Sequence, residues 1–274
     1  MKFAICNEVF SEWDFQRVVK FVKEAGYDGI EIAPFTLADS VTEISAPRRR
    51  ELKRMAADAG LEITGLHWLL VKPEGLHISH PDPTIRSRTV DYLCRLMEFS
   101  ADLGGKILTF GCPKQRTVLP EATLKESWKW ALETFLACGE TAEKHGVVLC
   151  LEALPSRDTD FLNTNAQVLA FVKEANHPNI RMMLDVKSMC AEDIPVPENI
   201  RSCNGFFDHV HANDSNLRAP GFGEVDFRPI FSTLAEVGYD GYVSVEPFDY
   251  SPDPETLAIK TLEYMKDCLH GVLA

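Results

Sequence analysis

Short apolar runs alternate along the chain with longer segments in which apolar residues recur at helical spacing. Eight runs have the near-continuous apolar character of strands that are buried on both faces. They are KFAICN at 2–7, YDGIEIAPF at 27–35, LEITGLHW at 61–68, KILTFG at 106–111, VVLCLEALP at 147–155, NIRMMLDV at 179–186, GFFDHVHAND at 205–214 and YDGYVSVEPF at 239–248. The helical spacing predicts helices that include 14–25, 82–103, 121–145 and 254–269.

Five of these runs follow closely on a glycine that ends a helical segment: Gly26, Gly60, Gly104, Gly146 and Gly238. Glycine readily takes the left-handed conformation at a helix C-terminus, so each marks a join from helix to strand. Eight strands, each followed by a helix and with no flexible linker, predict a single (β/α)8 TIM barrel that spans residues 1–274. A doubly wound open sheet is the alternative. The near-duplicate segments GYDGIEIAPF and GYDGYVSVEPF favour the closed ring.

The composition narrows the range of partners. Lys and Arg number 28 against 41 Asp and Glu, which gives a net charge of −13. This excess repels phosphate backbones and argues against a nucleic-acid partner. Because no apolar run approaches the roughly 20 residues that cross a bilayer, we expect no membrane partner. The eight cysteines are scattered without a CxxC pair, so we expect reduced thiols and a cytoplasmic protein that binds a small molecule. Assembly into a homo-oligomer stays open.

Four consecutive predicted strands each end in a side chain that can bind a metal. These residues are Glu152, Asp185, His211 and Glu246. Because a barrel carries its chemistry where the strands end, they are expected to meet at one rim. Three carboxylates and one imidazole suit a hard or borderline divalent ion such as Mn²⁺, Mg²⁺ or Co²⁺. Without an ion, the converging carboxylates would repel one another and their pKa values would rise.

The remaining histidines favour other roles. His209 shares a face with His211 but lies one layer deeper, so a core position is expected. His77, His80 and His177 lie in loops among Pro and Asp residues, where we expect them to face solvent.

The segments LEALPSRDTDFLNT, HPNIRMMLDVKSM, HVHANDSNLRAPGFGEVDF and GYDGYVSVEPF carry a resemblance to a known family. The chain resembles the xylose-isomerase-like TIM barrels grouped as sugar phosphate isomerases/epimerases, which include the ketose 3-epimerases and hydroxypyruvate isomerase. The resemblance covers essentially the whole chain and is densest between residues 147 and 248. It implies that Glu152, Asp185, His211 and Glu246 bind one divalent metal ion, commonly Mn²⁺, with Mg²⁺, Co²⁺ or Zn²⁺ as alternatives.

The resemblance also implies an isomerase or epimerase of a small sugar or keto-sugar. Glu152 and Glu246 would be its catalytic acid/base pair and would transfer a proton through a cis-enediolate. If the two carboxylates lie on opposite faces of that planar intermediate, the proton returns to the other face and the sugar is epimerised. If only one face is used, return to the neighbouring carbon gives aldose–ketose isomerisation.

The chain departs from the ketose epimerases at several positions. The family's histidine three residues after the metal aspartate is Ser188 here, and its arginine after strand seven is Leu217, beside Arg218. Lys187 is expected to share the face of Asp185 and to act as a catalytic cation in place of that histidine. Predicted substrate contacts are Asp158, His67, Arg218 and Trp68, the predicted pocket walls are Trp13, Trp68, Phe222 and Phe248, and Gly221 and Gly223 are expected to form a tight turn over the site. Because few Arg or Lys residues are evident for a phosphate, an unphosphorylated substrate is favoured.

Three alternatives remain. Proton abstraction beside a ketone can end in elimination, as in a metal-dependent lyase or dehydratase that acts on a keto-sugar or 3-keto-glycoside. A type IV apurinic endonuclease needs a three-metal cluster; His67 matches one of its additional histidines, but the negative charge and the residues Phe110, Ser188 and Phe227 disfavour it. A non-catalytic sugar-binding barrel is disfavoured by the complete set of four metal-ligand types.

Overall fold

Eight parallel strands form a closed barrel in the computed structural model, which describes residues 1–273. The strands are β1 (Lys2–Cys6), β2 (Gly29–Ile32), β3 (Glu62–Leu66), β4 (Ile107–Phe110), β5 (Val148–Leu151), β6 (Ile180–Asp185), β7 (Phe207–Ala212) and β8 (Tyr242–Val245). They pair in sequence order, and β8 closes the ring against β1 with Val243 opposite Phe3. The predicted TIM barrel is confirmed, and the open sheet is excluded.

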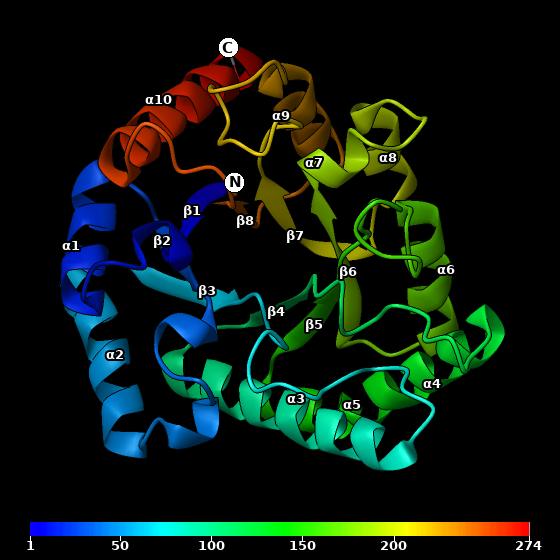
Figure 1. Ribbon diagram of the computed structural model, residues 1–274. Helices are drawn as coiled ribbons and strands as arrows, with labels where there is room; N and C mark the ends of the chain where they lie inside the picture. The colour runs from blue at the N-terminus through cyan, green and yellow to red at the C-terminus, as the bar shows by residue number, and fades with distance from the viewer. Residues whose placement is uncertain (274) are drawn as a thin grey trace.

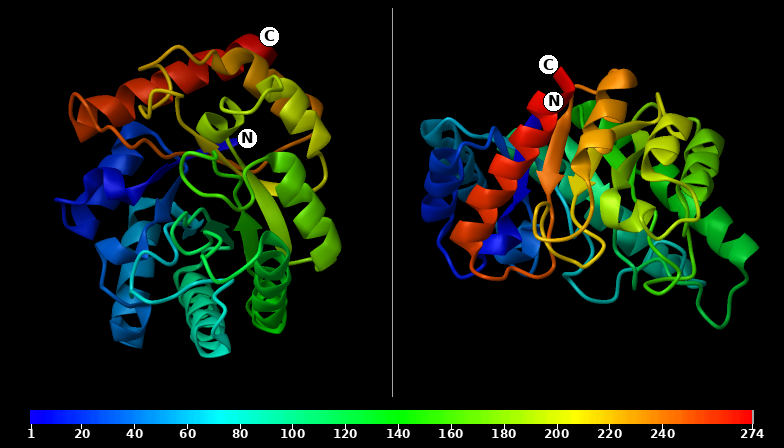
Figure 2. Two further views of the ribbon diagram at one scale, coloured as in Figure 1. Left: turned by 45° about the vertical axis from the view of Figure 1, so that its right-hand side comes forward. Right: turned by 90° about the horizontal axis from the view of Figure 1, so that it is seen from above.

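The helices surround the barrel (Figure 1). They are α1 (Phe15–Ala25), α2 (Ala46–Ala59), α3 (Pro83–Leu103), α4 (Leu124–Ala137), α5 (Gly139–His145), α6 (Asn165–Ala175), α7 (Val186–Met189), α8 (Val196–Ser202), α9 (Phe227–Glu236) and α10 (Pro254–Leu273), with short 3-10 turns η1 (Asn7–Phe10), η2 (Pro34–Thr36) and η3 (Val41–Glu43). Long connections that follow the strands gather at one end of the barrel (Figure 2). No helix within residues 1–273 is long and apolar enough to cross a membrane.

One predicted helix is wrong in extent. The segment 121–145 forms two helices, α4 and α5, which meet at Cys138. At the junction the backbone of Gly139 packs so closely on the His177 ring that a Cβ there would overlap it. The start of α4 at Leu124 follows from a capping box, in which Thr123 and Glu126 satisfy each other's backbone N–H groups.

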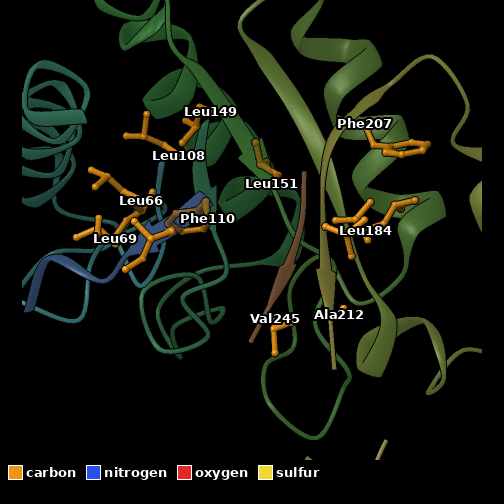
Figure 3. Close-up of a cluster of buried hydrophobic side chains, with 14 of the residues drawn as sticks. Leu66, Leu69, Leu108, Phe110, Leu149, Leu151, Leu184, Phe207, Ala212 and Val245 are labelled. Atoms are coloured by element: carbon orange, nitrogen blue, oxygen red, sulfur yellow. The ribbon is translucent and has the colours of Figure 1, made fainter. Parts of the chain in front are cut away.

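Alternation along the strands separates an apolar outer layer from a polar interior. Phe110 of β4 packs against Phe135 of α4 with 5.2 Å between ring centroids, so this face of β4 points to the helices. Figure 3 shows the same outer layer continuing across neighbouring strands through Leu66, Leu108, Leu149 and Leu184. Thr109, between Leu108 and Phe110, points the other way and donates a hydrogen bond to Glu31 of β2 inside the barrel. The barrel interior therefore holds buried polar side chains, which are available to a site at its C-terminal end.

Candidate metal and catalytic centre

A cavity of about 690 Å³ lies at the C-terminal ends of the strands. Seven of the residues predicted for catalysis, substrate binding or the pocket wall line it: His67, Trp68, Glu152, Asp158, Lys187, Glu246 and Phe248. Its lining also includes Gly111, Lys114 and Arg157, which the sequence analysis did not single out. The two cations were missed because they lie in loops, where spacing does not say which residues face a pocket.

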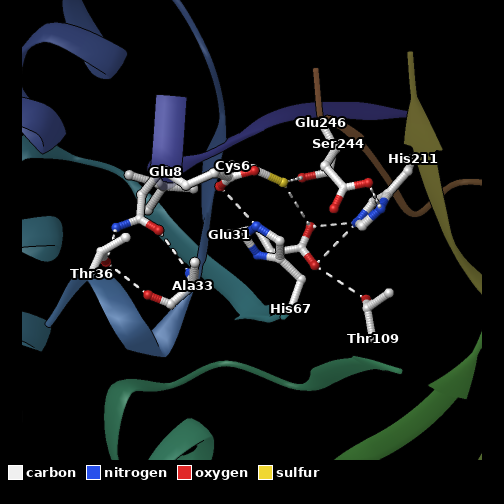
Figure 4. Close-up of polar contacts among 12 residues, drawn as sticks. Cys6, Glu8, Glu31, Ala33, Thr36, His67, Thr109, His211, Ser244 and Glu246 are labelled. Atoms are coloured by element: carbon white, nitrogen blue, oxygen red, sulfur yellow. Dashed lines mark hydrogen bonds and ion pairs between the residues drawn. The ribbon is translucent and has the colours of Figure 1, made fainter. Parts of the chain in front are cut away.

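Asp185, His211 and Glu246 form a buried cluster whose ligand atoms lie within 4.8 Å of one another. The Nδ1 atom of His211 is 3.0 Å from Oε2 of Glu246 (Figure 4). Asp185 and His211 are buried and do not line the cavity, whereas Glu246 does. The cluster therefore borders the cavity through Glu246.

Local contacts hold Asp185 in place. Its Oδ1 atom accepts the backbone N–H of Ser188 at 2.7 Å, which caps the short helix α7, and its Oδ2 atom accepts from the Asn213 side chain at 2.6 Å. The same Asn213 amide donates to the carbonyl of Glu246 and accepts the N–H of Lys187. Asn213 thus links the ends of β6, β7 and β8. Its place two residues after His211 was the only sequence signal of this role.

Glu152 lies next to this cluster, at the end of β5. Burial raises the pKa of its carboxyl group to about 8, and the negative charges of Asp185 and Glu246 raise it in the same direction. Such repulsion is expected where carboxylates converge at neighbouring strand ends. Behind Glu152, the fully buried Arg116 donates to the carbonyls of Glu152 and Phe110, both at 2.6 Å, and so joins the ends of β5 and β4.

Comparison with known proteins places this barrel in a family. The family model described as xylose isomerase-like TIM barrel matches residues 19–268. The chain belongs to the xylose isomerase-like TIM barrel family. The family resemblance stated from the sequence is confirmed.

The relatives of the chain within this family include sugar epimerases. D-psicose 3-epimerase from Ruminiclostridium cellulolyticum is 30% identical over 243 residues, which cover 86% of this chain and 80% of the relative. L-ribulose 3-epimerase from Mesorhizobium japonicum is 31% identical over 248 residues, covering 90% and 80%. A crystal structure of D-psicose 3-epimerase with D-tagatose, from Clostridium cellulolyticum H10, superposes with a TM-score of 0.85 at 25% identity and covers 98% of this chain and 99% of that one. The predicted class, an isomerase or epimerase of sugars, is confirmed at the level of the family.

Lys187 lines the cavity, but the backbone geometry that places it there differs from the predicted strand alternation. The chain leaves the strand geometry after Asp185 and turns into α7, so strand alternation does not orient Lys187. Its side chain is buried, lines the cavity and places Nζ 4.8 Å from the Phe248 ring centroid. Burial lowers the pKa of Lys187, but the charges of Asp185, Glu152 and Glu246 outweigh burial and hold it above its usual value.

His67 and His209 each contact a buried glutamate that the sequence analysis did not single out. Nε2 of His67 lies 2.8 Å from Glu8, and Nε2 of His209 lies 2.8 Å from Glu31. His209 is buried in the barrel interior, as expected. A lone glutamate inside an apolar strand, as in GIEI at 29–32, was the signal for Glu31.

Three predicted pocket residues are not brought to the cavity. The Arg218 guanidinium donates to the carbonyls of Phe222 and Ser251, and neither Arg218 nor Phe222 is part of the cavity lining. Trp13 instead packs on Phe10 and under the Arg17 guanidinium.

Two further expectations need correction. Gly221 does take a left-handed φ of +86°, but its turn packs against Tyr264 of α10 instead of covering the cavity. His77 is buried, not solvent-facing, because its ring accepts the N–H of Ser79 and the loop folds onto Thr89 of α3.

Proposed function

We propose that the protein is a divalent-metal-dependent ketose 3-epimerase, which interconverts the C3 epimers of a ketose in the cytoplasm. The family membership and the 3-epimerases among the relatives support this choice. Lys114, Arg157 and Lys187 line the cavity, so the scarcity of cations that favoured an unphosphorylated substrate does not hold there. The eight cysteines are free thiols, which fits a reducing compartment.

The observation that carries the proposal is the pairing of Glu152 and Glu246 in one cavity. Both carboxyl groups line it, and they are close enough for the charge of Glu246 to raise the pKa of Glu152. Carboxyl groups beside the reacting carbon can take up and release a proton, as an acid/base pair requires. Two carboxyl groups bordering one cavity can serve the two faces of a planar intermediate.

The donor set fits a divalent cation. The ligand atoms of Asp185, His211 and Glu246 lie within 4.8 Å of one another, and Glu152, whose pKa the charges of Asp185 and Glu246 raise, would be the fourth ligand. The three carboxylates carry more negative charge than Lys187 can neutralise, and oxygen-rich sets with one imidazole suit Mn²⁺, with Mg²⁺, Co²⁺ or Zn²⁺ as alternatives. When bound, the ion would polarise the substrate carbonyl and make the adjacent C–H acidic.

The chain's own residues would then move the proton. One carboxylate, Glu152 or Glu246, removes the C3 proton from one face of the ketose, and the carboxyl group on the other side returns a proton to the opposite face. The Lys187 ammonium faces the same cavity and stabilises the negative charge that develops on the substrate oxygens. Trp68 and Phe248, which contact each other edge to face at 6.2 Å between centroids, supply an apolar wall.

Incubation in D₂O tests the proposal. D-psicose or L-ribulose is incubated with the Mn²⁺-loaded protein, and NMR follows deuterium at C3 and the appearance of the second epimer. We expect both, with loss of both signals after chelation of the metal. Elimination products would instead support the lyase alternative. Absence of exchange with these ketoses and with a 3-keto-glycoside would overturn the epimerase assignment.

A further inference from the structure

Glu31 of β2 is a fully buried carboxylate inside the barrel, and no step of the mechanism above uses it. It receives hydrogen bonds from three other strands. Thr109 of β4 donates at 3.1 Å (Figure 4). His209 of β7 contacts it at 2.8 Å. From β7 as well, Nε2 of His211 lies 3.3 and 3.2 Å from its two carboxylate oxygens. Cys6 of β1 approaches at 3.9 Å. Glu31 therefore faces a ring of donors across the whole barrel.

The ring of His211 is held from both sides. Nε2 faces Glu31, while Nδ1 faces Glu246 at 3.0 Å and belongs to the cluster with Asp185. A carboxylate accepts hydrogen bonds and does not donate them, so without an ion the ring can donate on both sides, to Glu31 and to Glu246. A cation bound at Glu246 would displace the Nδ1 proton, and Glu31 would keep the remaining ring proton on Nε2. Nδ1 is then the nitrogen whose lone pair is available to a cation.

Burying a carboxylate is costly unless every lone pair finds a donor, and an apolar side chain in its place is often neutral for stability. The fold alone therefore does not require an acid at the centre of the barrel. A carboxylate that orients a metal-binding histidine does have a use there, because it fixes the ring and increases the basicity of the ligand nitrogen.

We propose that Glu31 is a positioning residue that fixes the orientation and proton placement of His211, and thereby sets the affinity of the Asp185–His211–Glu246 cluster for a divalent ion. The inference rests on the metal site of the proposed function. In this role Glu31 would not itself bind the ion and would act through His211.

Glu31→Gln tests this role, with metal affinity as the readout. The amide loses the negative charge and replaces one acceptor oxygen with an NH₂ donor, so it can no longer accept from all the donors around Glu31. Mn²⁺ affinity is measured by competition with a fluorescent chelator, alongside circular dichroism and thermal unfolding. We expect the affinity to fall roughly 10- to 100-fold, the range found when a partner of a metal-binding histidine is removed.

Glu8→Gln is the matched control. Glu8 is also buried and also contacts the Nε2 of a histidine at 2.8 Å, but that histidine, His67, is outside the Asp185–His211–Glu246 cluster. The Mn²⁺ affinity of Glu8→Gln should stay within about threefold of the wild-type value. That change is smaller than the tenfold change that corresponds to about 1.4 kcal/mol. Equal losses in both variants, or an unchanged affinity in Glu31→Gln, would overturn the proposal. Failure of the wild-type protein to bind Mn²⁺ would instead refute the metal site itself.

A second measurement avoids the variant, in case Glu31→Gln does not fold. Histidine labelled with ¹⁵N in the wild-type protein loaded with diamagnetic Mg²⁺ reports which ring nitrogen carries the proton. We expect the His211 signal, assigned by its loss in His211→Gln, to show a protonated Nε2 and an unprotonated Nδ1. The reverse arrangement would contradict the role of Glu31.

Discussion

The carboxylate of Glu152 occupies the space beside Gly111 that the Cβ of any other residue would need. Gly111 follows β4 and lines the cavity, and Glu152 follows the neighbouring strand β5. The absence of a side chain at position 111 therefore allows the carboxyl group to lie where Asp185 and Glu246 influence it.

Gly111→Ala is expected to lower kcat at least about tenfold while the protein stays folded. The atom that must move is the end of a flexible side chain, so the fold tolerates the methyl group, but a shift of about 1 Å in a catalytic group is enough to reduce the rate strongly. Steady-state kinetics and thermal unfolding measure the two effects. Gly271→Ala is the control, because a Cβ at this exposed position of α10 meets nothing within 4 Å. Unchanged kinetics in Gly111→Ala would show that the position of Glu152 is not critical.

Glu152→Gln and Glu246→Gln should each abolish epimerisation. Each variant keeps one of the two carboxyl groups and with it access to one face of the substrate. In D₂O, one variant should wash deuterium into C3 of one epimer and the other variant into C3 of the opposite epimer, without interconversion. NMR follows the exchange, and elemental analysis of the same samples shows whether the ion is retained. Near-wild-type turnover in both variants would rule the pair out as the catalytic couple.

Much of the architecture could be predicted because it is encoded locally. Glycines such as Gly26 and Gly146 end helices in the left-handed conformation directly before strands, and strand ends such as Glu152 and Glu246 can be identified from the apolar run before them. The contacts of Glu31 could not be predicted, because its partners lie on three other strands up to 180 residues away and meet only when the barrel closes.

Two predictions of local backbone geometry were wrong for a different reason. Lys187 was predicted by strand alternation, but the Asp185 side chain caps a new helix one residue later and changes the geometry. At the break between α4 and α5, the backbone of Gly139 packs on the ring of His177, which comes from a distant segment. The first failure comes from a local side-chain cap and the second lies at a tertiary contact, and the spacing of apolar residues shows neither.

Lys187→Met is expected to lower kcat at least about tenfold with metal content intact. The ammonium is buried among carboxylates at the cavity, where a donor aimed at developing negative charge is typically worth on the order of 10²–10³ in rate. Methionine keeps the unbranched stem but loses the ammonium group that lies 4.8 Å from the Phe248 ring centroid. The matched control is Lys129→Met on the exposed surface of α4, which should leave kinetics unchanged. Unaltered kcat and KM in Lys187→Met would limit this lysine to packing.

The metal-free protein should lose stability as the pH rises from about 4.5 to about 8. The Glu152 carboxyl has an ordinary pKa of 4.5 and a pKa of about 8 in the fold, so the folded state binds a proton in this window that the unfolded state has released. The contribution of Glu152 to the free energy of unfolding is therefore greatest below pH 4.5 and is lost as the pH rises to about 8. His211, whose pKa is also raised in the fold, changes stability in the same direction.

Urea unfolding of chelator-treated protein between pH 5 and 8.5 measures this slope. Mn²⁺ should remove or reverse this pH dependence of stability. The ion binds the deprotonated ligands and takes the place of the proton that reduces repulsion among the carboxylates. Glu152→Gln supplies the internal comparison: its metal-free form lacks the titrating carboxyl group and should show a shallower slope from the remaining contribution of His211. A metal-free wild type whose stability is flat or rises across this range would mean that Glu152 is already ionised without a cation, and that repulsion among the carboxylates is not what the ion relieves.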